Sequence, residues 1–184
     1  MQKNITNIIE ECKKGNRSSQ IKLYDTYCEA MYTVTCRYIE NKEDAKDVMQ
    51  ESFLKAFLKI NSYTPNYTIG AWLKKIVINT SIDFLKKKKI NYTSIEDLTY
   101  DIKEINEDSW EFDITITNTT ILNEIKCLPK RYEHVVMLYL IEGYDHEEIS
   151  EILDIPIKTS RTQLRRGRLL IQESLKKYYN ETRT

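Results

Sequence analysis

The segment from His146 to Arg168 restricts the fold most, because Pro156 divides it into two short stretches of opposite charge. The residue before a proline is driven away from helical backbone angles, so a helix boundary is expected there. The first stretch, Glu147 to Leu153, is acidic outside and carries Ile149, Ile152 and Leu153 on one apolar face. The second stretch, Lys158 to Leu170, holds five basic residues and no acidic residue. A short helix, a tight turn and a basic helix predict a helix-turn-helix, with a solvated basic helix of an ordinary bundle as the alternative.

The composition of the whole chain predicts an all-α protein. Only 4 glycines and 3 prolines occur in 184 residues, and long segments show helical periodicity. This length accommodates one ordinary domain or two small ones. Apolar runs stay shorter than the roughly 20 residues that span a bilayer, and the N-terminus has no apolar core of signal-peptide length, so we expect a cytoplasmic protein.

The net charge of zero conceals a segregated distribution. Residues 1–90 hold 16 basic and 10 acidic residues, a net charge of +6. Residues 91–118 hold one lysine and eight acidic residues, a net charge of −7, and residues 119–184 hold 11 basic and 10 acidic residues, a net charge of +1. We therefore expect two helical domains joined by an acidic linker, which acts either as a solubilising tether or as a segment attracted to basic channels.

Periodicity and capping residues predict the elements within the two domains. The expected N-terminal helices run from Ile5 to Lys14, from Gln20 to Ile39 behind a Ser18 or Ser19 cap, from Lys42 to Ile60 behind an Asn41 cap, and from Ile69 to Lys89, with a loop at Asn61 to Thr68. The C-terminal part is expected to restart at Thr120, to break at Pro129 and to end a helix at Gly143, and a polar tail is expected after the helix-turn-helix.

The sequence contains no combination of residues that indicates catalysis. It shows no nucleophile–base pair, no glycine-rich phosphate loop and no metal-ligand spacing, so we expect a binding protein without cofactor, metal or small-molecule substrate. The four cysteines, Cys12, Cys28, Cys36 and Cys127, form no CxxC pair, and we expect reduced and mostly buried thiols.

Three motifs resemble those of bacterial sigma factors. The stretch Asp44 to Phe53, DAKDVMQESF, is similar to their D-A-x-D-x-x-Q-E-x-F motif. The pattern W-L-x-x-I-x-x-N-x-x-x-D-x-x-[RK] follows at Trp72, Leu73, Ile76, Asn79, Asp83 and Lys86. Leu128-Pro129 followed by the helix-turn-helix resembles the promoter-reading domain of the same family. Over nearly its whole length the chain resembles an extracytoplasmic-function (ECF, group IV) sigma factor of the sigma-70 family.

This resemblance implies a role for each part of the chain. Residues 1–90 would form a helical bundle of sigma region 2 type that binds core polymerase and the −10 element. Residues 91–118 would be the acidic linker, and residues 119–184 a helix-turn-helix domain of sigma region 4 type that binds the −35 element. Expected partners are core RNA polymerase, through its β′ clamp coiled coil and β flap, promoter DNA, and an anti-sigma factor, which can be membrane-bound.

The third expected helix carries the candidate polymerase-binding residues. Acidic residues recur on it at spacings of three and four, beside an apolar row, and Gln50 adds directional hydrogen bonding. An acidic and apolar stripe is suited to docking a basic helix, whereas a solvated acidic face is the alternative. The candidates are Asp44, Asp47, Val48, Gln50, Glu51 and Phe53.

The fourth expected helix and the loop before it carry the candidate −10 residues. Aromatic rings beside cations suit single-stranded DNA, since rings stack on bases and lysines neutralise phosphates. By resemblance, the loop captures a flipped base. The candidates are Tyr63, Asn66, Tyr67, Lys74, Lys75, Asn79 and Lys86, while Trp72 is expected in the core and Asp83 is expected to support the domain.

The second helix of the helix-turn-helix carries the candidate −35 residues. Side chains near the start of such a helix reach base edges, while flanking arginines hold phosphates. Arg161 could read guanine, whereas Leu164 is expected in the core. The candidates are Lys158, Thr159, Ser160, Arg161, Thr162, Gln163, Arg165, Arg166 and Arg168.

Three positions depart from the family pattern. Asp154 stands where glycine is usual in the turn, although aspartate tolerates left-handed backbone better than most residues. Gln163 and Ile78 stand where arginine is common. The competing functions are a stand-alone helix-turn-helix regulator, which would dimerise to match half-sites, and an enzyme with an appended DNA-binding domain.

Overall fold

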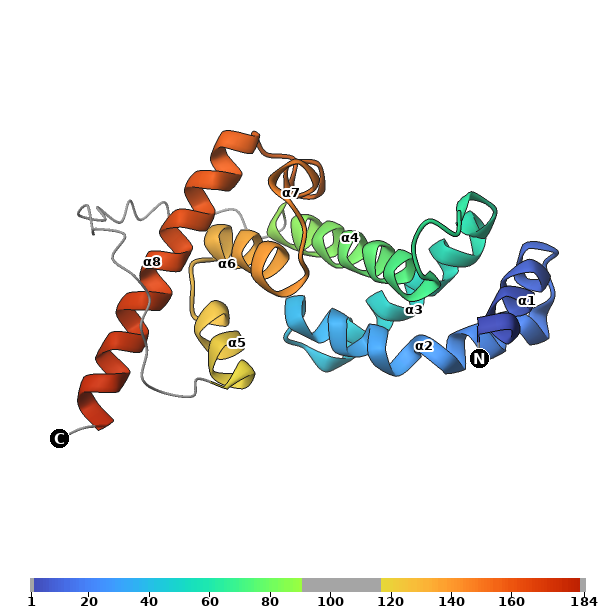
Figure 1. Cartoon of the computed structure of the whole chain (residues 1–184), viewed down its shortest axis with the longest axis horizontal. Helices are drawn as coiled ribbons and strands as arrows, with labels where there is room; N and C mark the ends of the chain where they lie inside the picture. The colour runs from blue at the N-terminus through green and yellow to red at the C-terminus, as the bar shows by residue number, and fades with distance from the viewer. Residues whose placement is uncertain (1, 91–116, 183–184) are drawn as a thin grey trace. The chain divides into compact units, whose positions relative to one another are not determined.

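The computed structural model describes residues 2–90 and 117–182, which form helices and connecting loops (Figure 1). The chain divides into two compact units, Met1–Ile95 and Glu96–Thr184. The expected acidic linker lies outside the described residues, apart from its last two positions. Thr117 caps the first helix of the second unit, and Asn118 is the first residue of that helix, two residues before the predicted restart.

The N-terminal unit is a bundle in which three long helices pack on one another and a short helix covers one end. Helices α2, α3 and α4 contact each other pairwise, and α1 packs on α2. The elements are α1 (Gln2–Lys13), α2 (Arg17–Tyr38), α3 (Lys42–Lys59), the 3₁₀ turn η1 (Ile60–Ser62) and α4 (Ile69–Ile90). The four predicted helices are therefore present, with shifted ends.

Asparagine caps determine where the two central helices begin. The Asn41 side chain accepts hydrogen bonds from the backbone N–H groups of Glu43 and Asp44, at 2.9 Å each, so the predicted cap of α3 is confirmed. The predicted Ser18 or Ser19 cap of α2 is wrong. Asn16 is the cap, its Oδ1 accepting from the N–H of Ser19 at 3.1 Å, and α2 therefore begins three residues before the predicted Gln20.

The core of the N-terminal unit is apolar, with a few buried hydroxyl groups. Leu23, Leu73 and Ile78 are at most 1% exposed. The hydroxyls of Thr35, Ser52 and Ser81 donate to carbonyl oxygens four residues earlier, which satisfies them inside the core. Ile21 and Leu58 do not belong to this core, since they are 55% and 84% exposed.

The C-terminal unit is organised around one long helix. It comprises α5 (Asn118–Lys126), α6 (Lys130–Val136), the π-helical turn η2 (Met137–Ile141), α7 (His146–Leu153) and α8 (Ile157–Thr182). Helix α8 packs against α5, α6 and α7. The crossing of α6 and α8 is close, because a Cβ atom at Gly167 would lie 2.4 Å from Val136 Cγ2.

Helix α8 is longer than predicted at both ends. It begins at Ile157, directly after Pro156, whose carbonyl oxygen accepts from the backbone N–H of Ser160 at 3.0 Å. The polar tail expected after the helix-turn-helix is helical to Thr182 instead. Ile171 and Leu175 are buried on the same side as Leu164, and this continued apolar row holds the second half of the helix against the unit.

The cysteines are free thiols, but burial differs from expectation. Cys12 is buried, Cys28 and Cys36 are half-buried, and Cys127 is exposed. Burial raises the pKa of the Cys12 thiol, which keeps it protonated.

Within residues 2–90 and 117–182, none of the helices combines the length and apolarity that a membrane crossing requires. The same residues include no cluster of three or more His, Cys, Asp or Glu side chains arranged to hold a metal ion.

Candidate functional site

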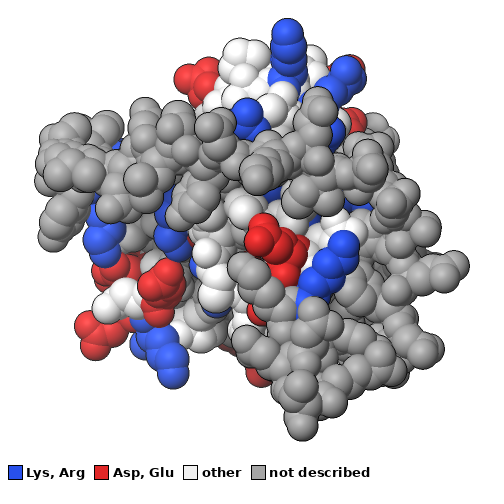
Figure 2. All heavy atoms as spheres, turned by 90° about the vertical axis from the view of Figure 1, so that its left-hand side faces the viewer, with Lys and Arg blue, Asp and Glu red and all other residues white. Residues whose placement is uncertain are grey.

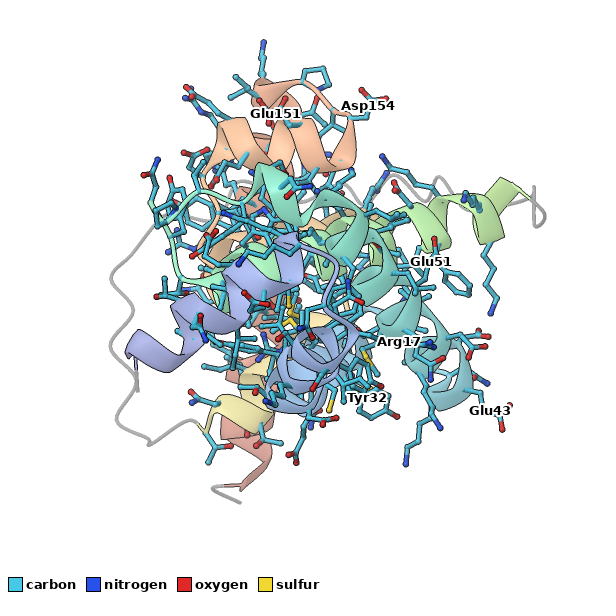
Figure 3. The ribbon with its side chains drawn as sticks, turned by 90° about the vertical axis from the view of Figure 1, so that its right-hand side faces the viewer. Arg17, Tyr32, Glu43, Glu51, Glu151 and Asp154 are labelled. Carbon is cyan, nitrogen blue, oxygen red and sulfur yellow. The ribbon has the colours of Figure 1, made fainter. Side chains whose placement is uncertain are left out.

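Helix α3 presents an exposed row of acidic and amide side chains. Asp47, Gln50 and Glu51 are exposed and, at spacings of three and four, lie on one side of the helix. The Glu51 carboxylate forms an ion pair with Lys55, four residues further along the same helix, at 2.8 Å. Figure 3 shows Glu43 and Glu51 on the outside of the N-terminal unit. Two of the predicted carboxylates, Asp47 and Glu51, are thus exposed to a partner.

Two leucines extend this row toward the end of the helix. Leu54 is 65% exposed and Leu58 is 84% exposed, and they follow Glu51 at spacings of three and seven. Exposed leucines aligned on a helix are typical of an interaction surface, whereas single exposed apolar residues are ordinary. We call Asp47, Gln50, Glu51, Leu54 and Leu58 the α3 outer face. Sequence reasoning did not include Leu54 or Leu58 among the contact residues, although the spacing from Glu51 could have revealed both.

Three predicted polymerase-binding residues are not free for such a contact. Val48 and Phe53 are each 2% exposed, so their prediction as contact residues is corrected: they belong to the core. The Phe53 ring meets the Tyr24 ring edge-on at 4.8 Å between centroids. Asp44 is half-buried and forms an ion pair with Lys88 of α4, at 2.9 Å.

Helix α4 presents a mixed polar face. Lys75, Asn79 and Lys86 are exposed and lie on one side of the helix, because their spacings of four and seven correspond to about one and two turns. Asp83, expected to support the unit, is exposed on this same face. Lys74 is half-buried and points about 100° away from Lys75, toward the side that carries Val77. The structure therefore brings together all the predicted α4 cations except Lys74.

The loop before α4 is built from aromatic residues. The Tyr63 hydroxyl donates to the backbone carbonyl oxygen of Tyr67 at 2.7 Å, and its ring meets Trp72 edge-on at 5.6 Å. Trp72 is half-buried, which agrees with its expected role in packing. Tyr67 is 75% exposed and Asn66 is exposed. Tyr63 thus holds the loop, while Tyr67 and Asn66 are available to a ligand.

Capping and turn hydrogen bonds define the helix-turn-helix. The Asp145 side chain accepts from the N–H groups of Glu147 and Glu148, and Glu148 accepts in return from the N–H of Asp145, which forms a capping box at the start of α7. At its end, Asp154 has φ 57° and ψ 51°, the left-handed conformation inferred for it. The Ser150 hydroxyl donates to the carbonyl oxygen of Ile155 at 2.6 Å and closes the turn.

The first turns of α8 present basic and polar side chains. Figure 2 shows Lys and Arg side chains at the top of the view, at the end of the C-terminal unit where α8 begins. Lys158, Arg161, Thr162, Arg165, Arg166 and Arg168 are exposed, and Thr159 and Gln163 are half-buried. Leu164 is 6% exposed, as predicted for a core residue.

Ser160 does not belong with these exposed side chains. Its side chain is 0% exposed, so its prediction as a DNA contact is corrected. Its Oγ lies 2.9 Å from Nδ1 of His146, which joins the starts of α7 and α8. Burial, and to a lesser degree the charge of Arg161, lower the pKa of His146, so the ring is neutral near pH 7. The His146 ring also stacks on Tyr139 at 4.9 Å.

Comparison with known proteins agrees with this two-part arrangement. The description "Sigma-70 region 2" matches residues 23–90, and "Sigma-70, region 4" matches residues 119–171. The fold and its exposed surfaces thus define a sigma-70-type transcription factor with two of the family's regions.

Relatives that match this chain over nearly their whole length indicate which group of sigma factors it belongs to. The ECF RNA polymerase sigma factor SigW of Bacillus subtilis is 30% identical over 91% of this chain and 95% of its own length. The RNA polymerase sigma factor SigV of the same organism is 32% identical over 90% of this chain and 96% of its own length. The chain belongs to the ECF sigma factors, which are non-enzymatic and direct transcription initiation with RNA polymerase.

Two solved structures share the fold. CnrH in complex with the cytosolic domain of CnrY has a TM-score of 0.52 and 16% identity, covering 92% of this chain and 95% of its own. The sigma factor RpoE in complex with the anti-sigma factor NepR, from Bartonella quintana, has a TM-score of 0.54 and 18% identity, covering 84% of this chain and 95% of its own.

Proposed function

We propose that this ECF sigma factor binds core polymerase through the α3 outer face, holds the melted −10 strand with α4 and the preceding loop, and reads the −35 duplex with α8. The observation that carries the proposal is the exposed row on α3, in which carboxylates are followed by Leu54 and Leu58, 65% and 84% exposed. Such exposure in an otherwise apolar-core bundle is accounted for by a partner.

The α3 outer face favours a helical partner of basic and apolar character. Its carboxylates would pair with lysines or arginines, and its leucines would enter the apolar row of the same partner helix. The β′ clamp coiled coil of core polymerase is our proposed partner, with the β flap as partner of the C-terminal unit. Asp44 contributes less than predicted because Lys88 already neutralises it.

The loop and α4 together suit an unpaired DNA strand. Tyr67, 75% exposed, offers a ring on which a base can stack, and Asn66 offers an amide for a base edge. Lys75 and Lys86 on the exposed face of α4 would neutralise phosphates of that strand. In this arrangement Tyr63 positions the loop through its hydrogen bond and does not itself contact a base.

The start of α8 suits the major groove of duplex DNA. Apart from Ile157, which is 38% exposed, its exposed side chains are basic or polar, and α7 packs against this helix. Thr162 and Arg165 lie on the outward ridge, where base edges are within reach, and Arg161 and Arg168 lie on one flank. Both DNA contacts in one chain fit promoter recognition without dimerisation.

We also propose an anti-sigma factor as a partner and the cytoplasm as the location. The structures of CnrH and RpoE each contain a bound protein, which for RpoE is an anti-sigma factor. An anti-sigma factor that covered the α3 outer face would compete with polymerase for the same leucines.

Run-off transcription with core polymerase tests the function. The protein should direct a promoter-specific transcript from DNA selected by the reconstituted holoenzyme, and it should co-purify with core. A chain that binds duplex DNA as a dimer, does not bind core and yields no transcript would instead be a stand-alone helix-turn-helix regulator.

Charge reversal tests the docking surface. Asp47→Lys with Glu51→Lys should weaken core affinity at least about tenfold, and Leu58→Ala, which removes no core contact, should weaken it about fivefold. The matched control is Asp25→Lys, an exposed carboxylate on α2. Unchanged core affinity in the α3 variants, or equal loss in the control, would refute the proposed surface.

A further inference from the structure

The C-terminal unit contains a groove beside the first three turns of α8. It has a volume of about 280 Å³ and lies between these turns and the start of α6. Arg131 and Tyr132 line it from α6, and Lys158, Thr159, Thr162, Gln163 and Arg166 line it from α8. Arg131 is not among the residues predicted to contact DNA.

The groove is positively charged. Three cations line it, Arg131, Lys158 and Arg166, and among its lining residues there is no Asp or Glu. Tyr132 is 1% exposed and therefore fixed in the core, and the Arg131 guanidinium lies over its ring at 4.7 Å. This stacking holds a rigid fork of hydrogen-bond donors beside the groove, a geometry that suits phosphate oxygens.

The groove runs along one edge of the surface that faces bases, since Lys158 and Thr162 line it and also belong to that surface. Lys158, Thr162 and Arg165 lie opposite the buried residues Ser160 and Leu164, so they form the outward ridge of the helix. Thr159 and Gln163 are half-buried in the groove wall on one flank. Arg161 and Arg168 lie on the other flank. Cations therefore border the ridge on both sides, as the two phosphate strands border a major groove.

We propose that this groove binds a backbone phosphate of the duplex that α8 enters, with Arg131 and Arg166 donating hydrogen bonds to its oxygens. The inference rests on the proposed −35 binding and deepens it by adding Arg131 as a DNA contact and by moving Thr159 and Gln163 from base reading to the wall of a phosphate site. Because a phosphate is present at every step, this contact fixes position and carries no sequence preference.

The test measures the salt dependence of DNA binding by the full chain. A labelled 30-bp duplex of fixed sequence is titrated by fluorescence anisotropy from about 20 to 200 mM KCl. Loss of one phosphate contact makes the slope of log K against log[salt] shallower by about 0.9. Over this range of salt, the binding constant K then falls about eightfold less than in the wild-type chain. Arg131→Ala should show this loss, and Arg131→Lys should restore most of the slope. Lys176→Ala, which removes an exposed cation of α8 outside the groove, is the matched control and should retain the wild-type slope.

Each other outcome contradicts the proposal. Equal slopes for Arg131→Ala and wild type, an equal fall in Lys176→Ala, or no duplex binding by the wild-type chain would overturn it. Inorganic phosphate that competes beyond KCl of the same ionic strength, and only in wild type, would assign the groove to the free anion instead. Run-off transcription distinguishes failure of this proposal from failure of the proposed function. If the wild-type chain yields a transcript but Arg131→Ala has the wild-type slope, only the phosphate site is refuted. If Arg131→Ala lowers the slope but the wild-type chain yields no transcript, only the sigma role is refuted.

Discussion

Asp154 sets the angle of the helix-turn-helix at the cost of a left-handed backbone. Its φ of 57° is unfavourable for a residue with a Cβ, and its carboxylate lies at the C-terminal end of α7, where the helix dipole disfavours negative charge. Glycine has neither disadvantage. Asp154→Gly should raise the free energy of unfolding of the C-terminal unit by about 0.5 kcal/mol, and Asp154→Ala should lower it by about 0.5–1 kcal/mol. Urea unfolding followed by circular dichroism measures both, and a glycine variant less stable than the alanine variant would contradict this account.

Tyr144 makes the C-terminal unit sensitive to alkaline pH. Burial, with smaller contributions from Glu142 and Glu148, raises the pKa of Tyr144 to about 12. Tyrosine in an unfolded chain ionises near about 10, so the folded state binds this proton more tightly. Its contribution to stability is complete below about pH 10 and is lost as the pH rises toward about 12.

Replacement of the hydroxyl isolates this effect. Tyr144→Phe should show a smaller loss of unfolding free energy than wild type between about pH 9.5 and 11.5, because the other groups titrate equally in both proteins. The measurement is the slope of unfolding free energy against pH. Parallel curves for the two proteins would show that Tyr144 does not titrate as described.

The crossing of α6 and α8 depends on a missing side chain. A Cβ at Gly167 would lie 2.4 Å from Val136 Cγ2, closer than packed atoms can approach, so Gly167→Ala should lower the free energy of unfolding by about 1–3 kcal/mol. Val136→Ala in the same chain should reduce the extra loss. Gly70→Ala serves as the comparison, since its Cβ would meet the Tyr27 ring at 3.1 Å and needs a smaller shift. Thermal unfolding checks the order, and an additive double variant would exclude a clash.

The start of a helix was predictable where two features of the local sequence indicate the same residue. Asn41 both caps α3 and precedes its periodic residues, and Pro156 both ends the turn and starts α8. Asn16 was missed because Ser18 and Ser19 are equally good capping residues, and only the geometry of the turn at Gly15, with φ 79°, selects among them.

The site was predictable in outline but not side chain by side chain. Spacing placed Asp47, Gln50 and Glu51 on one side of α3. The same helix carries apolar residues on both of its sides, so spacing alone could not decide that Val48 is buried while Leu58 is exposed. Packing against α2 and α4 makes that choice, and it is a property of the tertiary structure.

The distribution of charge along the chain predicts weaker non-specific binding of DNA. Residues 1–90 have a net charge of +6, whereas residues 91–118 have a net charge of −7. We expect an acidic segment between two units that are proposed to bind DNA to repel duplex DNA, which would lower the affinity without changing either contact surface.

Neutralising that segment tests this effect. With its eight acidic residues replaced by the corresponding amides, the chain should bind a non-specific duplex at least about tenfold more tightly at low salt, and the difference should vanish near about 0.5 M salt. Fluorescence anisotropy measures it, and a segment of the same composition in shuffled order is the control and should bind as wild type does. The positions are Glu96, Asp97, Asp101, Glu104, Glu107, Asp108, Glu111 and Asp113.

A single helix of 26 residues, about 39 Å long, both carries the side chains proposed to read DNA and completes the core of the C-terminal unit. Its outward side chains can be exchanged freely, but its axis cannot tilt unless the contacts of Ile171 and Leu175 tilt with it. A new promoter preference in this chain is therefore accessible through the chemistry of a few exposed positions and inaccessible through a new angle of approach. A temperature-sensitive substitution in the core of this unit should then abolish promoter recognition altogether at the higher temperature and should not change which promoters are recognised.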